Sequence, residues 1–479
     1  MSKDAVPGLL ASATEVLEAE FGSLPAFASE AGPSTEAMAE VLGSVAHRLG
    51  DNYPYFHPLY AGQMLKPPHP VARAAYALAM KINPNNHARD GGRASSEMEV
   101  EAVGEIAEMF GWKEFLGHLT SSGTLANLEA LWIAGQLAPG RRIVGSEQAH
   151  YTHQRISGVL KLEYVGIATD NRGRMSLDAL EAELGKGDVG TVVATLGTTA
   201  IGAIDALDEI LALKKRYGFR VHVDAAYGGY FGLISDTLNE PVRRAYAALG
   251  QADSIAIDPH KHGLQPYGCG CVLFRDPAVG RYYKHDSPYT YFTSKELHLG
   301  EISLECSRAG AAAVALWATQ RLMPLKPGGD FARGLERGRR AAMELDRRLR
   351  TDERFVTLGG SAPGSPNTRD TGHPPELDIV VWALRGANPQ EASERARRVF
   401  DACAARGLHL ALVQLPGSWF GAGGGGASQV ANGEGSAPRG PEAPTITCLR
   451  SVLMKPEHEA WLGEIWERLS AACGEVLSG

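Results

Sequence analysis

Apolar residues between positions 117 and 274 follow two alternating patterns. Short apolar runs typical of buried strands are separated by stretches in which apolar residues recur every three or four positions, as on amphipathic helices. Strands and helices in alternation predict a mostly parallel sheet with helices on both faces. We expect seven strands: a short one that begins at residue 117, followed by strands at 142–145, 163–166, 191–195, 221–224, 254–257 and 270–274. The domain that holds this sheet is expected to span residues 56–325.

The pattern changes after Met323 and Pro324, where a second set of elements begins. We predict helices at 330–350, 389–406 and 457–477 and strands at 377–384, 408–415 and 445–454. These elements predict a smaller α+β domain over residues 326–479. Its Gly/Ser/Pro tract at 421–444 has too few apolar residues to order itself, so we expect a disordered loop there, with a mobile lid as the alternative.

The N-terminal part of the chain predicts two short helices that are interrupted by the stretch SEAGPST. Two such helices cannot form a core by themselves, so we expect residues 1–55 to pack on a partner subunit. Residues 52–70 are dense in proline and aromatic side chains, which predicts irregular chain that lines a pocket. A longer helix is expected at 97–110, with Ser95 or Ser96 as its N-cap.

The composition is that of a soluble globular enzyme and excludes several classes of function. Hydrophobic residues make up 44% and charged residues 21% of the 479 residues. A net charge of −8 offers no basic surface to nucleic acid or to anionic membranes. We find no secretory signal and no apolar run that could span a bilayer, so we expect a cytoplasmic protein. The six cysteines lack the spacing of a disulfide framework or a zinc site, so we expect reduced thiols and no metal.

The strongest chemical signal is an aspartate and a lysine that lie 37 positions apart. Asp224 ends the apolar run VHVDAA, and Lys261 lies between His260 and His262 in DPHKHGL. A packed core rarely holds an unpaired lysine. A pyridoxal phosphate site explains the pattern, because its lysine forms a Schiff base while a carboxylate keeps the pyridine nitrogen protonated. The alternative is a strand-end aspartate and an unrelated surface lysine.

Three further positions suit the same cofactor. Ser122, Gly123 and Thr124 open a predicted helix, whose free N–H groups and positive dipole favour a phosphate group, although the same residues also serve as ordinary caps. His150 follows a short strand in SEQAHYTHQ and is either a side chain that covers a flat ring or a surface residue. Thr199 in TLGTT also ends a strand. Its hydroxyl is suitable as a hydrogen-bond partner of Asp224, the aspartate that ends the other strand. The alternative is an ordinary threonine in a turn.

The segments HVDAAY, PHK, QAH and TLGTT, in this order and spacing, resemble the group II pyridoxal phosphate-dependent decarboxylases. This family includes aromatic amino acid, tyrosine, glutamate and diaminobutyrate decarboxylases. The resemblance covers residues 52–325 and extends more faintly to the C-terminus, where LRSVLMKP resembles the last strand of bacterial members. It implies an α/β protein of pyridoxal phosphate fold type I, with a large, mostly parallel seven-stranded sheet domain and a small C-terminal α+β domain. It also implies a homodimer whose active sites are built from both subunits.

The resemblance assigns roles to individual residues. Lys261 is the implied Schiff-base lysine, Asp224 the partner of the pyridinium nitrogen, and His150 the histidine that stacks on the ring. The implied contacts to the phosphate and to the other ring face come from Ser122, Gly123, Thr124, His260 and Ala226. The expected cofactor-binding set is completed by Thr199 and by Asp258, which stands where animal aromatic decarboxylases have asparagine.

A proton donor above the ring plane is needed after CO2 leaves. The family supplies a tyrosine from a loop that reaches into the neighbouring subunit's site. In this chain the loop lies within KHDSPYTYFTSKELHLGE, where Tyr291 is the first choice and Tyr289 the second. Plant relatives with phenylalanine at the acid position release an aldehyde, so the neighbouring Phe292 leaves an aldehyde-forming oxidative decarboxylase as an alternative.

The expected substrate-binding residues are Tyr55, His57, Gln63 and Arg308, with fixation of the preceding loop as the alternative role of Arg308. Gln63 and Met64 stand where aromatic decarboxylases have large rings, and glutamate decarboxylases have glutamine in a similar place, so the substrate class stays open. Tyr53 and Phe56 favour an aromatic substrate. Arg450 either binds an α-carboxylate or forms a structural ion pair.

These features predict a decarboxylase that converts an L-α-amino acid, with an aromatic one favoured, to its amine and CO2. A carbon–carbon lyase of the sphingosine phosphate lyase type is the main alternative. An aminotransferase is disfavoured by His260 directly before the lysine. A binding protein that lost the chemistry is disfavoured by the intact Lys261, Asp224 and His150.

Overall fold

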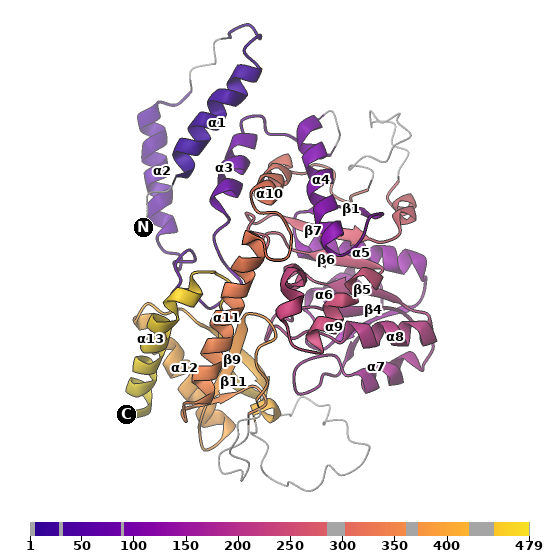
Figure 1. Cartoon of the computed structure of the whole chain (residues 1–479), viewed down its shortest axis with the longest axis vertical. Coiled ribbons are helices and arrows are strands. Elements are labelled where there is room, and N and C mark those ends of the chain that lie inside the picture. The colour runs from indigo at the N-terminus through magenta and orange to yellow at the C-terminus, as the bar shows by residue number, and fades with distance from the viewer. Residues whose placement is uncertain are drawn as a thin grey trace.

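The structure is a computed structural model that describes residues 5–27, 32–87, 91–284, 302–360, 372–420 and 445–478. Two sheets organise these residues, one with seven strands and one with four. Figure 1 shows the large sheet with its helices beside the small sheet, and helices α1 and α2 along one side of the molecule. In the part of the chain that is described, we find no helix with the length and apolar character needed to cross a membrane.

The large sheet has the strand order β1-β7-β6-β5-β4-β2-β3. Its strands are β1 (Leu116–Thr120), β2 (Arg142–Ser146), β3 (Tyr164–Ile167), β4 (Val189–Thr195), β5 (Arg220–Asp224), β6 (Ser254–Ile257) and β7 (Gly270–Phe274). Neighbouring strands are parallel except where β7 pairs antiparallel with β1 and β6. The seven predicted strands are confirmed, and their expected ends differ from the observed ones by at most two residues.

Helices cover the large sheet, and the parallel strands carry their functional residues to one edge. The helices that follow its strands are α5 (Gly123–Leu137), α6 (Thr152–Val159), α7 (Leu177–Leu184), α8 (Leu207–Tyr217) and α9 (Val242–Ala247). Strands β4, β6 and β7 are buried along their whole length, as expected when both faces of a sheet are covered. Thr195 and Asp224 are paired neighbours at the carboxyl ends of β4 and β5. Ligands of open α/β sheets bind at this edge.

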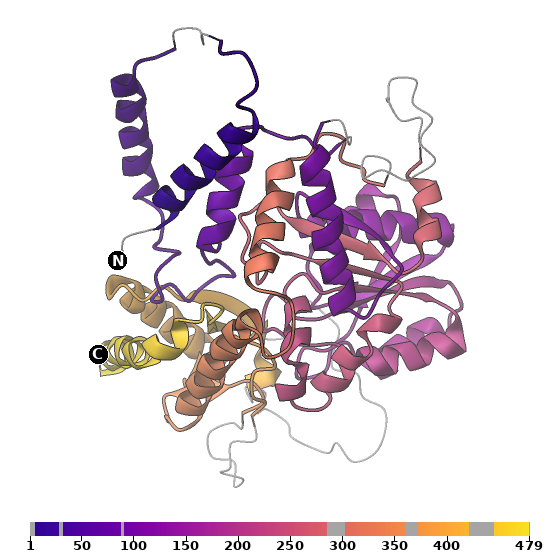
Figure 2. The same ribbon diagram turned by 45° about the horizontal axis from the view of Figure 1, so that its top comes forward.

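Helix α4 differs from the helix expected at 97–110. It spans Arg93–Met109, and its N-cap is Gly92 rather than Ser95 or Ser96. The Ser95 hydroxyl donates to the side chain of Asn86, so it ties the helix to the preceding loop instead of capping it. Helix α10 (Gly310–Leu322) packs against both α4 and α3 (Pro70–Ala79). Figure 2 shows these three helices side by side.

The small sheet is antiparallel and has the strand order β10-β11-β9-β8. Its elements are α11 (Asp330–Arg350), β8 (Phe355–Thr357), β9 (Ile379–Leu384), α12 (Pro389–Ala405), β10 (Ala411–Pro416), β11 (Thr445–Val452) and α13 (His458–Ser478). The expected small α+β domain is thereby confirmed. Strand β8 was not predicted, because three residues are too few to show an alternating pattern. The loop expected at 421–444 lies outside the described residues.

The two expected N-terminal helices are α1 (Val6–Glu20) and α2 (Thr35–Leu49), and neither has a buried residue. Helix α1 packs beside α3, whereas α2 stands apart from both sheets in Figures 1 and 2. The apolar side chains of α2 are between 45% and 66% exposed; they are Met38, Val41, Leu42, Val45 and Leu49. Because they recur at helical spacing, they form one apolar stripe.

Candidate active site

A cavity of about 200 Å³ lies at the carboxyl ends of β4 and β5 and at the start of α5. It is lined by Ser122, Gly123, Thr124, Asn127, His150, Thr152, Thr195, Gly197, Thr199, Asp224, Ala226, Tyr227, Asp258, His260 and Lys261. All ten residues expected to bind a cofactor are in this set. Asp224 and Lys261, which are far apart in the sequence, therefore face the same space.

The Asp224 carboxylate is held by two hydrogen bonds at the end of β5. Its Oδ1 accepts from the backbone N–H of Ala226 at 3.1 Å, and its Oδ2 lies 2.8 Å from Nε2 of His153. Burial alone would raise the pKa of Asp224, but the hydrogen bond from His153, with the nearby charge of Lys261, lowers this pKa well below its usual value. Asp224 is therefore ionised at neutral pH, as required of a carboxylate that keeps a pyridine nitrogen protonated.

Lys261 reaches the cavity from the loop after β6. Its Nζ lies 3.0 Å from Oδ2 of Asp258, and its side chain is 23% exposed. The same carboxylate oxygen lies 3.6 Å from Nε2 of His260. Asp258 therefore places a negative charge between the lysine and the histidine that follow it in the sequence.

The start of α5 forms the third wall of the cavity. Ser122 is the N-cap, and its hydroxyl accepts from the backbone N–H of Leu125. A Cβ at Gly123 would lie 2.5 Å from Oδ1 of Asp258, so only glycine fits at this point without displacing the carboxylate. The backbone at the positive end of the helix is therefore open to the cavity, which favours a bound anion.

The two cavity histidines are held in different ways. His150 accepts a hydrogen bond from the backbone N–H of Thr152 through Nδ1 at 3.3 Å. Nδ1 of His260 lies 2.7 Å from the carbonyl oxygen of Cys269, so this nitrogen carries the proton and leaves Nε2 at the cavity. Burial lowers the pKa of both rings. Both imidazoles are therefore neutral at pH 7.

The residues present fit pyridoxal phosphate. A primary amine, an ionised carboxylate and a helix N-terminus suit its aldehyde, ring nitrogen and phosphate, and all three line one cavity. Asp258 and Thr195 line this cavity. Oδ1 of Asp258 and Oγ1 of Thr195 are buried and have no hydrogen-bond partner among the described residues. Such atoms need a partner to offset the cost of their burial.

Four residues expected to bind substrate do not line the cavity of the described chain. Tyr55 packs edge-on against Tyr60, with ring centroids 4.9 Å apart. His57 packs against Trp461 of α13 at 4.8 Å. The guanidinium of Arg308 lies 2.6 Å from Glu99 and donates to the carbonyl of Leu119, which fixes the loop before α10. Gln63 is the fourth and is held by Arg450. Tyr289 and Tyr291 lie outside the described residues.

Arg450 has neither of its two expected roles in the described chain. Its guanidinium donates to the backbone carbonyls of Thr199, Ala200 and Gly62 and to the side chain of Gln63. Its donors are therefore occupied by loop carbonyls rather than by a carboxylate. Arg450 ties strand β11 of the small sheet to the Thr199 loop at the cavity.

Sequence reasoning missed the side chain that supports Asp224. The expected partner was the hydroxyl of Thr199, but the described contact comes from His153 in the first turn of α6. His153 lies three positions after His150, and only this spacing marks it in the sequence. Asn127, Thr152, Thr195, Gly197 and Tyr227 also line the cavity and were not predicted.

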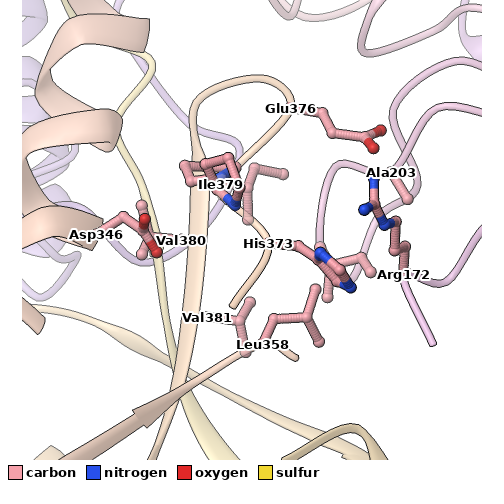
Figure 3. Close-up of a pocket in the computed structure, with 12 residues that line it drawn as sticks. Arg172, Ala203, Asp346, Leu358, His373, Glu376, Ile379, Val380 and Val381 are labelled. Atoms are coloured by element: carbon pink, nitrogen blue, oxygen red, sulfur yellow. The ribbon is translucent and has the colours of Figure 1, made fainter. Parts of the chain in front are cut away.

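A second cavity lies between the two sheets but is far smaller. Figure 3 shows it between His373, Glu376 and Arg172, with Ile379 and Val381 of β9 nearby. Its volume of about 30 Å³ is enough for one or two water molecules and too small for an amino acid. The cavity at Lys261 is therefore a better candidate active site than this small cavity.

The sheet order, the small antiparallel domain and a lysine and an aspartate in one cavity define a pyridoxal phosphate protein of fold type I. The profile of the pyridoxal-dependent decarboxylase conserved domain matches residues 134–360. L-tyrosine decarboxylase of Enterococcus faecium is 28% identical over 392 residues, which cover 61% of this chain and 64% of that enzyme. A probable L-tyrosine/L-aspartate decarboxylase of Methanothrix thermoacetophila is 30% identical over 292 residues, or 60% of this chain and 71% of that protein.

Solved structures share the fold over nearly the whole chain. Mouse CSAD superposes with a TM-score of 0.72 at 20% identity and covers 96% of this chain and 92% of its own. Oryza sativa TDC with PLP and tryptamine superposes with a TM-score of 0.73 at 18% identity and covers 99% of both chains. The chain belongs to the group II pyridoxal phosphate-dependent amino acid decarboxylase family.

Proposed function

We propose that the protein is a pyridoxal phosphate-dependent decarboxylase that converts an L-α-amino acid to its amine and CO2. The observation that carries the proposal is that Lys261 and Asp224 line one cavity together with the N-terminus of α5. Membership of the decarboxylase family supports pyridoxal phosphate as the cofactor and decarboxylation as the reaction. We further propose an aromatic substrate, which is supported by relatives that are L-tyrosine decarboxylases.

The bound cofactor supplies an electron-withdrawing ring that stabilises negative charge on the carbon that loses CO2. Lys261 would hold this cofactor covalently, and Asp224 would keep a proton on its ring nitrogen. The start of α5, with the hydroxyls of Ser122 and Thr124, would hold the phosphate, and His150 would contact the ring. Tyr227 and Ala226 follow Asp224 and are buried, so this wall of the site excludes water.

A CO2-release assay over a panel of amino acids tests the proposed reaction. The panel contains tyrosine, tryptophan, aspartate, glutamate and 2,4-diaminobutyrate, and mass detection separates amine from aldehyde. We expect the highest kcat/KM with an aromatic amino acid and equal amounts of amine and CO2. Release of CO2 from none of them by protein that has bound pyridoxal phosphate would contradict the proposal.

We propose Tyr291 as the proton donor, with Tyr289 as the alternative. Both lie outside the described residues, so the assignment rests on the resemblance of this segment to the family. Tyr291→Phe is expected to lower amine formation by about 10²- to 10⁴-fold, the usual contribution of a positioned acid, and to shift the product toward aldehyde and ammonia. The ratio of amine to aldehyde measured by mass spectrometry checks this. A shift in Tyr289→Phe alone would assign the role to Tyr289.

We also propose that the protein is a homodimer in which α2 packs on the partner subunit. The apolar stripe of α2 is the support, because exposed stripes of this size on a helix mark interfaces. Leu42→Glu, in the middle of the stripe, is expected to weaken the dimer, since it places a charge in an apolar contact. Light scattering after size exclusion should then give twice the chain mass for the unmodified protein and a lower mass for the variant.

Ser44→Glu is the matched control for the dimer test. It adds the same charge to α2 on the face opposite Leu42, and we expect it to leave the mass unchanged. A monomeric unmodified protein at micromolar concentration would refute the proposed dimer.

A further inference from the structure

Asp224 has a side-chain partner that none of the assigned roles explains. His153 is fully buried, and its Nε2 lies 2.8 Å from Oδ2 of Asp224. Its Nδ1 has no hydrogen-bond partner among the described residues. The imidazole therefore makes its hydrogen bond to the carboxylate at the active site and to no other described group.

The surroundings identify His153 as the donor in this contact. An ionised carboxylate only accepts hydrogen bonds, so the proton lies on Nε2 of His153. The neighbouring His222, whose ring centroid is 6.4 Å away, is held by Asn127 and Ser254 and makes no bond to Asp224. Burial lowers the pKa of His222 to about 3, so this ring is neutral. The other titratable groups that interact electrostatically with Asp224 are His150, Tyr164 and Lys261.

The position of a shared proton depends on which partner is the stronger base. A carboxylate and a pyridine nitrogen compete for one proton in a buried site, and a carboxylate without other donors becomes the stronger base as it loses water. A hydrogen bond donated to the carboxylate stabilises its ionised form, so the proton remains on the nitrogen. For Asp224, the hydrogen bond from His153 is the strongest of the effects that lower its pKa.

We propose that His153 is a positioning residue that keeps the proton on the cofactor's ring nitrogen and off Asp224. The inference rests on the proposed cofactor site and adds a residue outside the wall of the cavity. No bond to carbon forms or breaks in this role. His153 acts through Asp224 by orienting its carboxylate and by holding it in the ionised form.

The test measures the ring nitrogen directly, with isotope-labelled pyridoxal phosphate and nitrogen NMR of the holoenzyme. In His153→Leu, which removes the donor, the ring nitrogen resonance should move toward that of neutral pyridine. We also expect kcat to fall by about 10- to 100-fold, the usual cost of losing a supporting partner, with KM nearly unchanged. His153→Gln keeps an N–H donor and should restore much of the unmodified resonance and kcat.

His118→Leu is the matched control. His118 and Glu129 form another buried histidine–carboxylate pair in the same domain, 2.9 Å apart and away from the cavity. We expect His118→Leu to lower the stability of the fold about as much as His153→Leu does. The resonance of the cofactor's ring nitrogen should nevertheless stay unchanged. If His153→Leu does not fold, His153→Asn, which is too short to reach Asp224, replaces it.

Two outcomes separate this inference from the proposed function. A His153 variant without a donor that binds pyridoxal phosphate and keeps the unmodified resonance and kcat overturns the role of His153 alone. An unmodified protein that binds no pyridoxal phosphate overturns the proposed function itself.

Discussion

Lys261→Ala is expected to abolish covalent attachment of pyridoxal phosphate and to lower turnover by several powers of ten. In the proposed site this side chain supplies the amine that would hold the cofactor, and the loss of a covalent nucleophile has an effect of this size. The absorbance band of the bond between lysine and cofactor should disappear in the variant, although the residues of α5 that we propose to hold the phosphate are unchanged. An absorbance titration with added cofactor, together with kcat, measures both effects.

Lys214→Ala is the control for this variant. Lys214 lies on α8 and pairs with Asp253 at 2.6 Å, and it does not line the cavity. We expect this variant to keep its colour and its activity. A Lys261→Ala protein that stays yellow and active would remove Lys261 from its role.

Asp224→Ala is expected to lower kcat on the order of a thousandfold, the size of effect that follows the loss of a buried electrostatic partner. The carboxylate is ionised and buried, so its charge acts on the ring nitrogen with little screening. Without it, the ring nitrogen loses its proton and the ring withdraws electrons less strongly. Steady-state kinetics measures the loss of turnover. The nitrogen resonance of labelled cofactor measures the loss of the proton from the ring nitrogen.

Asp224→Asn separates the effect of the negative charge from that of the side chain's size, because the amide is uncharged and nearly as large as the carboxylate. We expect this variant to be about as slow as the alanine variant. Asp253→Asn provides the control at the opposite ends of the strands, since Asp253 precedes β6 and bonds Lys214 and the backbone of Val221. Near-normal turnover in Asp224→Ala would contradict the role of this aspartate.

The large sheet and most of the residues that line the candidate cavity were predictable because their signals are local. Each buried strand is a short apolar run, so its position follows from the hydrophobic pattern. Asp224 ends one such run, and the carboxyl ends of parallel strands meet at one edge, which brings it near Thr195 and the start of α5. His260 and His262, the neighbours of Lys261 in the sequence, then mark it as the lysine that we propose to hold the cofactor.

The parts that were not predictable depend on contacts between distant segments. The bond from His153 to Asp224 joins positions 71 residues apart, and no local pattern distinguishes His153 from a packed core histidine. Arg450 could not be assigned because its partners are backbone carbonyls, and these have no signature in the sequence. Ser95 was misassigned as a cap because its hydroxyl bonds the side chain of Asn86 across a loop.

Borohydride reduction of the pyridoxal phosphate-bound protein, followed by peptide mapping, tests the central claim most directly. Reduction makes the bond between lysine and cofactor permanent, so the added mass marks the attachment site. We predict the modification on the peptide that contains Lys261 and, in Lys261→Ala, on no peptide. Modification of a different lysine, or of none, in the unmodified protein would contradict the assignment of this cavity as the active site.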